Sequence, residues 1–416
     1  MSRALESTSS AGQEREAEAS SGVVLGGITL AHGVFHFLNQ SFLVMLPALR
    51  DALGIDAVQV GAIISAREIA SGLSALPGGI ICDRFSRQWG RVMAICMAAY
   101  ALGWVGVALS PSYYLLILAM VVVAVSGSVW HLPSMAALSY HHSKRRGTAL
   151  SIYGVGGSAG DVAGPVITGF ALAYLSWRGV LSLYALVPLL LAMASLWAFR
   201  GIGPQEDNGA NGMALRAQLR QSIGLLRKPA LWRVNVVFGL HSMCAQIFTV
   251  FLPLFLADEM GFDTRAIGFH LALLFTLGIF ASPLMGYASD RLSRKAVLVP
   301  LLLGSAVLSL TMALFGRGIV LTIIIALLGI ALRSDYSVLS AMALDIVGQD
   351  MATTTLGVLS FTRFGMAAIA PLIAGALYER WGMAPPLYMV TILFMAAGFL
   401  LMATQLPRPQ ERSVEA

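Results

Sequence analysis

Twelve long apolar runs divide this chain of 416 residues, and short polar segments separate one run from the next. Most runs are near or above the roughly 20 residues that an α-helix needs to cross the hydrocarbon core of a bilayer. Lipid offers the backbone no hydrogen bonds, so only helices and closed barrels span it, and barrel strands are about half as long. The sequence therefore predicts an all-α membrane protein with twelve transmembrane helices. The runs lie at about 23–47, 57–81, 92–110, 113–139, 147–174, 178–199, 233–257, 267–289, 296–315, 318–345, 354–377 and 386–406.

Charge is scarce in this chain and unevenly distributed. Charged residues make up only 12% of it, whereas a soluble domain carries roughly 25%. Fifteen Lys and Arg residues fall in loops on one side of the predicted membrane and five on the other. Because cytoplasmic loops are enriched in Lys and Arg, this division predicts cytoplasmic termini and a location in the cytoplasmic (inner) membrane. The net charge of +6 follows from the same bias, so it indicates no nucleic-acid partner.

The nine-residue pattern G-x-x-x-D-R-x-S-R occurs at 79–87 and again at 286–294. Each copy ends an apolar run and opens a short charged loop, and such duplication is typical of transporters built from repeated halves. We therefore expect two pseudo-symmetric six-helix halves. The expected division is a disordered cytoplasmic tail at 1–21, an N-terminal half at 22–199, a cytoplasmic linker at 200–232, a C-terminal half at 233–406 and a cytoplasmic tail at 407–416.

The fifth run carries glycine at every fourth position, as Gly156, Gly160 and Gly164, and Pro165 follows them. The eleventh run repeats this proline as Pro371. Small residues at this spacing form a face that lets a neighbouring helix approach closely, and a proline bends the helix axis. Two interpretations are open: the face serves tight packing alone, or it seals one half against the other in one conformational state.

The duplicated loop and the glycine-rich run resemble those of a known family. The loop is similar to the signature loop of the major facilitator superfamily, and the fifth run is similar to that of its proton-coupled antiporters. Members of the fosmidomycin-resistance branch usually carry an aspartate in the first span where this chain has Gln40. The resemblance therefore implies a drug–proton antiporter but supplies no proton-binding carboxylate in the first span. The stretches most like this branch are Trp130-His131-Leu132-Pro133, His36-Phe37-Leu38-Asn39 and Gly154-x-Gly156-Gly157.

The two loops contain the residues expected to hold the halves together. The resemblance implies that Asp83 meets a helix N-terminus and basic partners across the interface between the halves. A carboxylate at a helix N-terminus gains about 0.3–1 kcal/mol. Such a latch would favour the outward-open state and break during transport; a simpler interpretation is that the charges only fix topology. The expected latch residues are Asp83, Arg84, Arg87, Asp290, Arg291 and Arg294.

Charged residues inside the predicted spans are costly, so they usually serve a function or pair with one another. We expect Glu68 and Asp161 to be the proton-coupling carboxylates, because burial raises the affinity of a carboxylate for protons and a nearby arginine lowers it. Arg333 and Arg363 indicate a substrate with an anionic group. The alternative is internal pairing, for example of Asp335 with Arg363.

Four polar residues of the first run lie on one helical face, at spacings of i, i+4, i+7 and i+8. We expect this stripe to line a substrate cavity, together with histidines and charges from other runs. The spacing of histidines and carboxylates along the chain matches no metal-ligand pattern, so no metal and no cofactor are expected. The expected cavity residues are His32, His36, Asn39, Gln40, His131, His241, Arg333, Asp335 and Arg363.

These observations predict a secondary transporter that moves a small organic solute, anionic or amphiphilic, by alternating access. Proton-coupled efflux is the favoured direction. The alternatives are uptake of an organic anion by proton symport and a non-transporting membrane sensor on the same scaffold. The chain has no phosphate-binding glycine-rich loop with Lys-Ser/Thr, so neither an enzyme nor ATP-driven transport is expected. The expected partners are the substrate, protons and the lipid bilayer, and we expect a monomer.

Overall fold

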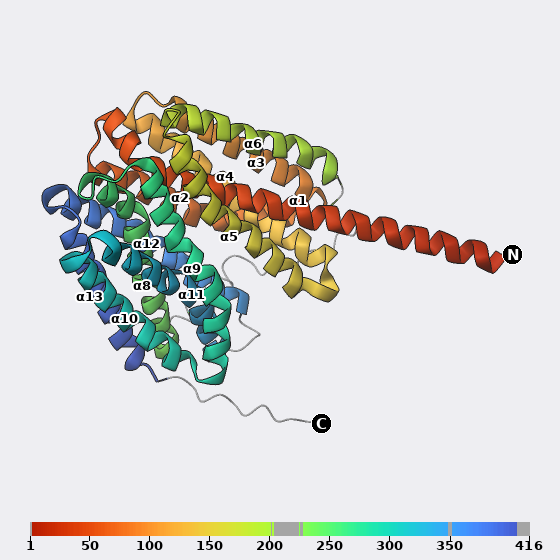
Figure 1. Ribbon diagram of the computed structural model, residues 1–416. Coiled ribbons are helices and arrows are strands. Elements are labelled where there is room, and N and C mark those ends of the chain that lie inside the picture. Colours follow the sequence, from red (N-terminus) through yellow and green to blue (C-terminus); the bar gives the residue numbers. More distant parts are fainter. Residues whose placement is uncertain (1, 201, 204–223, 225–227, 348–351, 406–416) are drawn as a thin grey trace. The chain divides into compact units, whose positions relative to one another are not determined.

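The computed structural model describes residues 2–200, 202–203, 224, 228–347 and 352–405 of the protein (Figure 1). The side chains of 2–21, 76, 144, 334–337, 352–354 and 356–357 lie outside this description. The described residues form twelve α-helices and two short 3₁₀ turns, η1 (Ser86–Gln88) and η2 (Ser143–Arg145), with no strand among them. The predicted all-α fold is therefore confirmed.

Six of the α-helices end before the predicted linker at 200–232, and the next six begin with α8 at Pro229, within its last residues. Ten of the described helices are long and apolar enough to cross a membrane. The other two are α2, which contains Arg67 and Glu68, and α5, which contains Asp161 among glycines. The helices are α1 (Ser2–Leu53), α2 (Ala57–Arg84), α3 (Trp89–Leu109), α4 (Tyr113–His141), α5 (Arg146–Ala171), α6 (Trp177–Ala198), α8 (Pro229–Asp258), α9 (Thr264–Arg291), α10 (Arg294–Phe315), α11 (Gly318–Val347), α12 (Ala352–Trp381) and α13 (Ala384–Met402).

Local sequence signals set several helix ends. The side chains of Ser176, Asp263 and Ser293 each accept a hydrogen bond from the backbone N–H three residues later, at the starts of α6, α9 and α10. Gly54 and Gly382 follow the last residues of α1 and α12 with φ angles of 60° and 71°. Other residues rarely adopt this conformation. These glycines therefore allow the sharp turns into α2 and α13.

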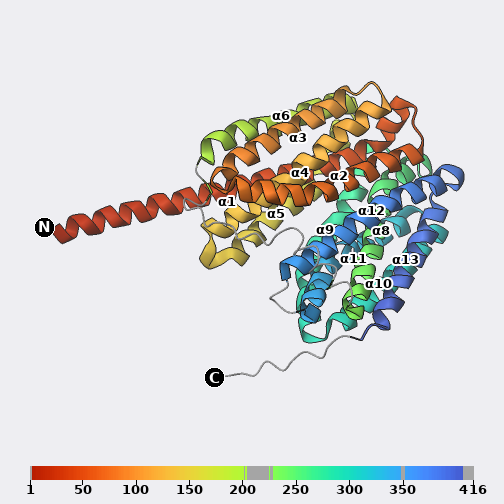
Figure 2. The same cartoon turned by 180° about the vertical axis from the view of Figure 1, so that it is seen from behind.

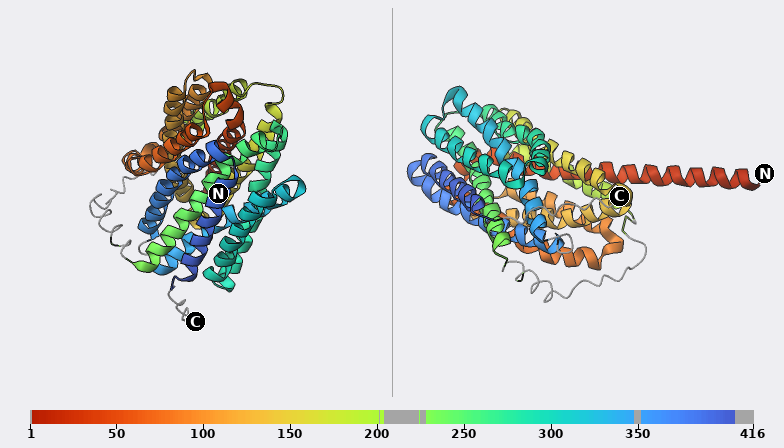
Figure 3. Two further views of the ribbon diagram at one scale, coloured as in Figure 1. Left: turned by 90° about the vertical axis from the view of Figure 1, so that its left-hand side faces the viewer. Right: turned by 90° about the horizontal axis from the view of Figure 1, so that it is seen from below.

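The chain forms two compact units. The first consists of Met1–Phe42, Leu73–Ile167 and Tyr174–Ala210, and the second of Leu43–Gly72, Thr168–Ala173 and Asn211–Ala416. In the first unit α3 packs against α4 and α6 (Figure 2). In the second unit α9 packs against α11, α10 against α13 and α8 against α12, and Figure 3 gives two further views of these helices. The second unit therefore joins segments of α1, α2 and α5 to the C-terminal helices.

Both units bury large aromatic side chains and expose aliphatic ones. Trp104 and Trp130 are fully buried in the first unit, as are Phe248 and Phe251 in the second. Many large apolar side chains are nevertheless exposed on helix surfaces. That of Leu102, for example, is 67% exposed. A soluble protein rarely tolerates contiguous apolar surface of this kind, whereas lipid accommodates it. The pattern is that of a multi-pass membrane protein.

Three predicted segments need comment. The sequence predicts a disordered tail at 1–21, but α1 begins at Ser2 and is continuous through these residues. The physical reason is composition, since alanine and glutamate there are strong helix formers. Most of the predicted linker at 200–232, and the predicted tail at 407–416, lie outside the described residues. The six-helix halves stay a prediction, because the two compact units divide the chain differently.

Candidate functional site

The glycine-rich face of α5 lies against α1 in the first unit. A Cβ atom built on Gly156, Gly160 or Gly164 would lie 2.4, 2.2 or 2.6 Å from a backbone oxygen of α1. Only glycine permits such an approach of two helix backbones. Because α1 of the same unit covers this face, the structure supports the interpretation of tight packing. This contact also holds Asp161, which directly follows Gly160 on α5, beside α1.

Asp161 is fully buried. Its Oδ1 accepts hydrogen bonds from His36 Nδ1 at 2.8 Å and from Gln40 Nε2 at 3.0 Å. A buried carboxylate is costly unless it is hydrogen-bonded, so its charged form depends on these two donors. Gln40 of α1 therefore acts as a hydrogen-bond donor to a carboxylate that α5 supplies.

His36 belongs to a cluster of three histidines. The ring centroid of His32, one turn earlier on α1, lies 4.6 Å from that of His36 and 5.2 Å from that of His131 on α4. One ring nitrogen from each residue lies within 4.8 Å of the others. Three histidine nitrogens at this separation could hold a metal ion, an arrangement that the spacing along the chain did not indicate. Spacing along one helix cannot reveal a third histidine that α4 supplies.

Tyr153 of α5 completes this cluster, and the sequence analysis missed it. Its ring stacks on that of His32, with centroids 3.7 Å apart and planes 3° apart. Its backbone oxygen accepts a hydrogen bond from His32 Nδ1 at 2.8 Å. The available signal was a large aromatic residue about two turns before Asp161 in a helix of mostly small residues.

The second unit contains the other predicted coupling carboxylate. Glu68 of α2 is buried, and its Oε1 accepts a hydrogen bond from Gln246 Nε2 of α8 at 3.4 Å. Arg67 Nη2 lies 3.5 Å from the same oxygen. Adjacent residues on a helix point about 100° apart. Arg67 nevertheless reaches its neighbour, because the long arginine side chain lies back over the helix surface. Gln246 was not predicted.

The two arginines expected to attract an anion lie in the second unit. The guanidinium carbon of Arg333 on α11 lies 5.8 Å from the ring centroid of Phe275, and that of Arg363 on α12 lies 5.3 Å from that of Phe364. A ring face attracts a guanidinium, so each arginine makes a cation–π contact within the second unit. The side chain of Asp335 lies outside the described residues, so its pairing with Arg363 stays a prediction.

The remaining predicted cavity residues are spread over both units. His241 of α8 is buried in the second unit, whereas His131 belongs to the first. Asn39 is half-buried on α1. Pro371, which was predicted to serve helix packing and not the cavity, lies on α12 against α2. A Cβ atom on Gly61 of α2 would be 2.3 Å from its carbonyl oxygen. Within the first unit, the structure therefore brings His131 to the histidine stripe of α1.

The two copies of the duplicated loop differ in their contacts. In the second copy Asp290 pairs with Arg294, and Arg294 Nε also donates to Asp345 of α11 at 3.1 Å. Arg291 lies over the ring of Tyr287, 4.7 Å from its centroid. In the first copy the side chains of Asp83, Arg84 and Arg87 are exposed. The latch across the halves stays a prediction.

A polar cluster near the C-terminal ends of α1 and α8 was not predicted. Arg50 donates two hydrogen bonds to Asp258, from Nη1 at 2.5 Å and from Nη2 at 2.8 Å. The hydroxyl of Tyr378 on α12 donates to the same carboxylate at 2.9 Å. The backbone N–H of Ala57 donates to Glu379 at 2.8 Å. These bonds join α1 and α2 to α8 and α12 within the second unit, and pairing over such sequence distances cannot be read from the sequence.

We expect Asp258→Asn to lower thermal stability more than Asp51→Asn does. Both carboxylates bond Arg50, but the side chain of Asp51 is 68% exposed and that of Asp258 is 29% exposed. A two-pronged, partly buried ion pair contributes about 1 kcal/mol or more, whereas an exposed pair contributes about zero to 1 kcal/mol. Thermal unfolding of the purified protein in detergent measures both variants. Equal losses of thermal stability in the two variants would show that Arg50 does not pair more strongly with Asp258 than with Asp51.

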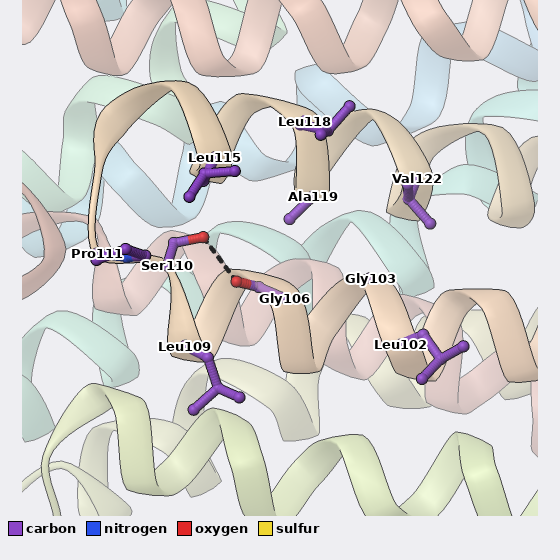
Figure 4. Close-up of a pocket in the computed structure, with 10 residues that line it drawn as sticks. All are labelled: Leu102, Gly103, Gly106, Leu109, Ser110, Pro111, Leu115, Leu118, Ala119 and Val122. Carbon is purple, nitrogen blue, oxygen red and sulfur yellow. Dashed lines mark hydrogen bonds between the residues drawn. The ribbon is translucent and has the colours of Figure 1, made fainter.

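An apolar groove runs between α3 and α4 in the first unit (Figure 4). Its volume is ≈ 370 Å³, and leucines such as Leu102, Leu109 and Leu118 line it. Ser110 at its end donates its hydroxyl hydrogen to the carbonyl of Gly106 at 2.6 Å. A groove of this chemistry on an exposed apolar surface fits a lipid acyl chain and not a charged solute. We therefore do not assign the substrate to it.

Buried carboxylates on membrane helices, together with histidines and half-buried arginines, are features that a membrane transporter for small molecules requires. The chain matches the model of the Major Facilitator Superfamily over residues 28–371 and 236–416. These matches span most of its length, so the chain belongs to this family. The protein is therefore a secondary transporter, and the resemblance found in the sequence is confirmed.

Individual relatives are distant but cover most of the chain. The fosmidomycin resistance protein of Escherichia coli (strain K12) is 26% identical over 353 residues, which is 83% of this chain and 82% of that protein. The probable sulfoacetate transporter SauU of Cupriavidus necator is 23% identical over 407 residues, 91% of this chain and 92% of that protein. A bacterial homologue of the human lysosomal transporter Spinster, solved in an inward-facing and occupied conformation, has a TM-score of 0.78 at 17% identity, covering 93% of this chain and 98% of that one. At that identity the structural likeness shows the fold alone.

Proposed function

We propose that the protein exports a small organic anion or amphiphile in exchange for protons, by alternating access. The observation that carries this proposal is Asp161, a fully buried carboxylate hydrogen-bonded to His36 and Gln40. Protonation of such a group removes a buried charge and rearranges its hydrogen bonds, which is what a coupling site requires. Glu68 is the second candidate, and it is buried in the second unit.

The two arginines and the names of two relatives support an anionic substrate or export. Arg333 and Arg363 place positive charge within α11 and α12, and guanidinium groups bind carboxylates and related oxyanions well. The Cupriavidus relative is named for sulfoacetate, which carries a carboxylate and a sulfonate. The Escherichia relative is named for resistance, and export of a toxic compound produces resistance.

The orientation and the latch belong to the same proposal. The fifteen-to-five division of Lys and Arg supports cytoplasmic termini, a cytoplasmic linker at 200–232 and a place in the inner membrane. The loop containing Asp83 is proposed to release and re-form during the transport cycle. The charge network of Asp290, Arg294 and Asp345 in the second copy supports the idea that these loops form ion pairs. The protein is proposed to act as a monomer.

Transport into proteoliposomes with an imposed pH gradient tests the proposed function. A panel of organic carboxylates, sulfonates and phosphonates serves as candidate substrates. An antiporter accumulates its substrate in vesicles with an acidic interior, because protons leaving the vesicle drive the substrate in. A proton symporter accumulates it only when the exterior is acidic. Accumulation only when the exterior is acidic would show that the protein takes up its substrate together with protons instead of exporting it. Accumulation under neither gradient would contradict proton coupling.

A further inference from the structure

We propose that His32, His36 and His131 form a binding site for a divalent transition-metal ion, with zinc as the expected occupant. One ring nitrogen from each residue lies within 4.8 Å of the others. Three nitrogen atoms separated by 4.8 Å have a common centre about 2.8 Å from each of them, whereas a zinc–imidazole bond is about 2.1 Å long. Each ring therefore needs to move by only about 0.7 Å to bind the ion.

Hydrogen bonds determine which nitrogen two of these rings offer. His32 Nδ1 lies 2.8 Å from the backbone oxygen of Tyr153, and His131 Nδ1 lies 2.6 Å from the backbone oxygen of Gly127. A carbonyl oxygen can only accept, so each Nδ1 carries the hydrogen and each Nε2 keeps its lone pair when the ring is neutral. Histidines that bind zinc have this arrangement, with the second ring nitrogen donating to a carbonyl or carboxylate.

The third histidine has a carboxylate in the same role. His36 Nδ1 donates to Asp161 Oδ1 at 2.8 Å when Asp161 is ionised. Carboxylate, histidine and metal in this order recur in zinc sites, where the carboxylate orients the ring and makes it a stronger ligand. Asp161 is fully buried, so its charge is well placed to offset part of the charge of a dication.

The surroundings hold the rings in place and select the kind of metal. The ring of Tyr153 stacks on that of His32, and His32 meets His36 and His131 edge-on, at interplanar angles of 81° and 82°. Three imidazoles suit zinc, copper, nickel and iron, whereas calcium and magnesium prefer oxygen ligands. A three-histidine zinc site also leaves a fourth position open to water or to an anionic group.

The test is zinc binding to the purified full-length protein, without a polyhistidine tag, by isothermal titration calorimetry. Cobalt serves as a second probe, because its visible absorption reports coordination geometry. His131→Asn keeps an N–H donor near the position of Nδ1 but has no ligand atom at the position of Nε2. The matched control is His270→Asn in the second unit, since His270 Nδ1 bonds the backbone oxygen of Ala266 four residues earlier in the same manner.

We expect one zinc ion per wild-type chain, and binding at least tenfold weaker in His131→Asn but unchanged in His270→Asn. Asp161→Asn is expected to weaken binding by about 10–100-fold, as loss of an outer hydrogen-bonding partner does in zinc sites. Thermal unfolding of each variant establishes that it is folded. Absence of zinc and cobalt binding by the wild-type protein would overturn the proposal, whatever the variants do. Equal affinities of the wild type and a folded His131→Asn protein would also overturn it. Neither result would bear on proton coupling.

Discussion

Asp161→Asn is expected to abolish substrate accumulation driven by a pH gradient while exchange of substrate down its own gradient continues. The asparagine keeps the shape of a protonated aspartic acid, and its oxygen can still accept hydrogen bonds from His36 and Gln40, which bond Oδ1 in the wild type. It binds no proton, however, so the site cannot gain and lose one in each cycle. Because coupling requires that step, we expect loss of accumulation rather than a partial decrease.

The experiment compares two rates in the same proteoliposomes. Counterflow of labelled substrate measures exchange, and uptake into acid-loaded vesicles measures coupling. Asp56→Asn is the control for removal of a carboxylate, because Asp56 is exposed and accepts a hydrogen bond from the N–H of Gln59 at the start of α2. Asparagine caps a helix as well as aspartate does, so this variant is expected to transport normally.

Glu68→Gln distinguishes the two candidate carboxylates. Glu68 bonds Gln246 and lies beside Arg67 in the second unit, and the variant removes its charge with little change of shape. Loss of accumulation in Glu68→Gln with full accumulation in Asp161→Asn would identify Glu68 on α2 as the coupling carboxylate. Full accumulation in both variants would place the coupling site elsewhere, and His32 and His36 would then be the next residues to test.

The fold could be predicted because it depends on patterns that are local in the sequence. Runs of apolar residues longer than a bilayer is thick allow one structure in lipid, and the structure has helices in all twelve places. Glycines at every fourth residue of α5 predict a close helix contact whatever the partner is. The partner itself, α1, was not predictable, because the spacing shows which residues share a face and not what lies opposite it.

The candidate site was only half predictable for the same reason. His32 and His36 share a helical face, so their proximity follows from helix geometry. The meeting of His32 with His131 depends on how α1 packs against α4, and the hydrogen bond from His36 to Asp161 depends on the contact between α1 and α5. Arg50 and Asp258 illustrate the limit, because residues 208 positions apart carry no shared pattern.

Gly160→Ala is expected to destabilise the protein strongly, whereas Gly154→Ala in the same helix is expected to be neutral or stabilising. A Cβ on Gly160 would lie 2.2 Å from the backbone oxygen of Gly33 and 2.8 Å from the backbone nitrogen of Phe37. A Cβ on Gly154 would meet nothing within 4 Å. Backbone atoms cannot rotate away as side chains do, so α1 and α5 must separate.

Both substitutions gain the same helix propensity, about 0.5–1 kcal/mol in favour of alanine. The difference between them therefore isolates the contact, and forcing a methyl group into a packed interface costs about 1–3 kcal/mol or more. Thermal unfolding of the two purified variants in one detergent measures this difference. Because Asp161 follows Gly160 directly, separation of α1 and α5 also weakens the hydrogen bond between Asp161 and His36. The Gly160→Ala variant is therefore expected to lose proton-driven transport even at temperatures where it remains folded. Equal midpoints for the two variants would show that the close contact between α1 and α5 is absent from the protein in its membrane-mimetic environment.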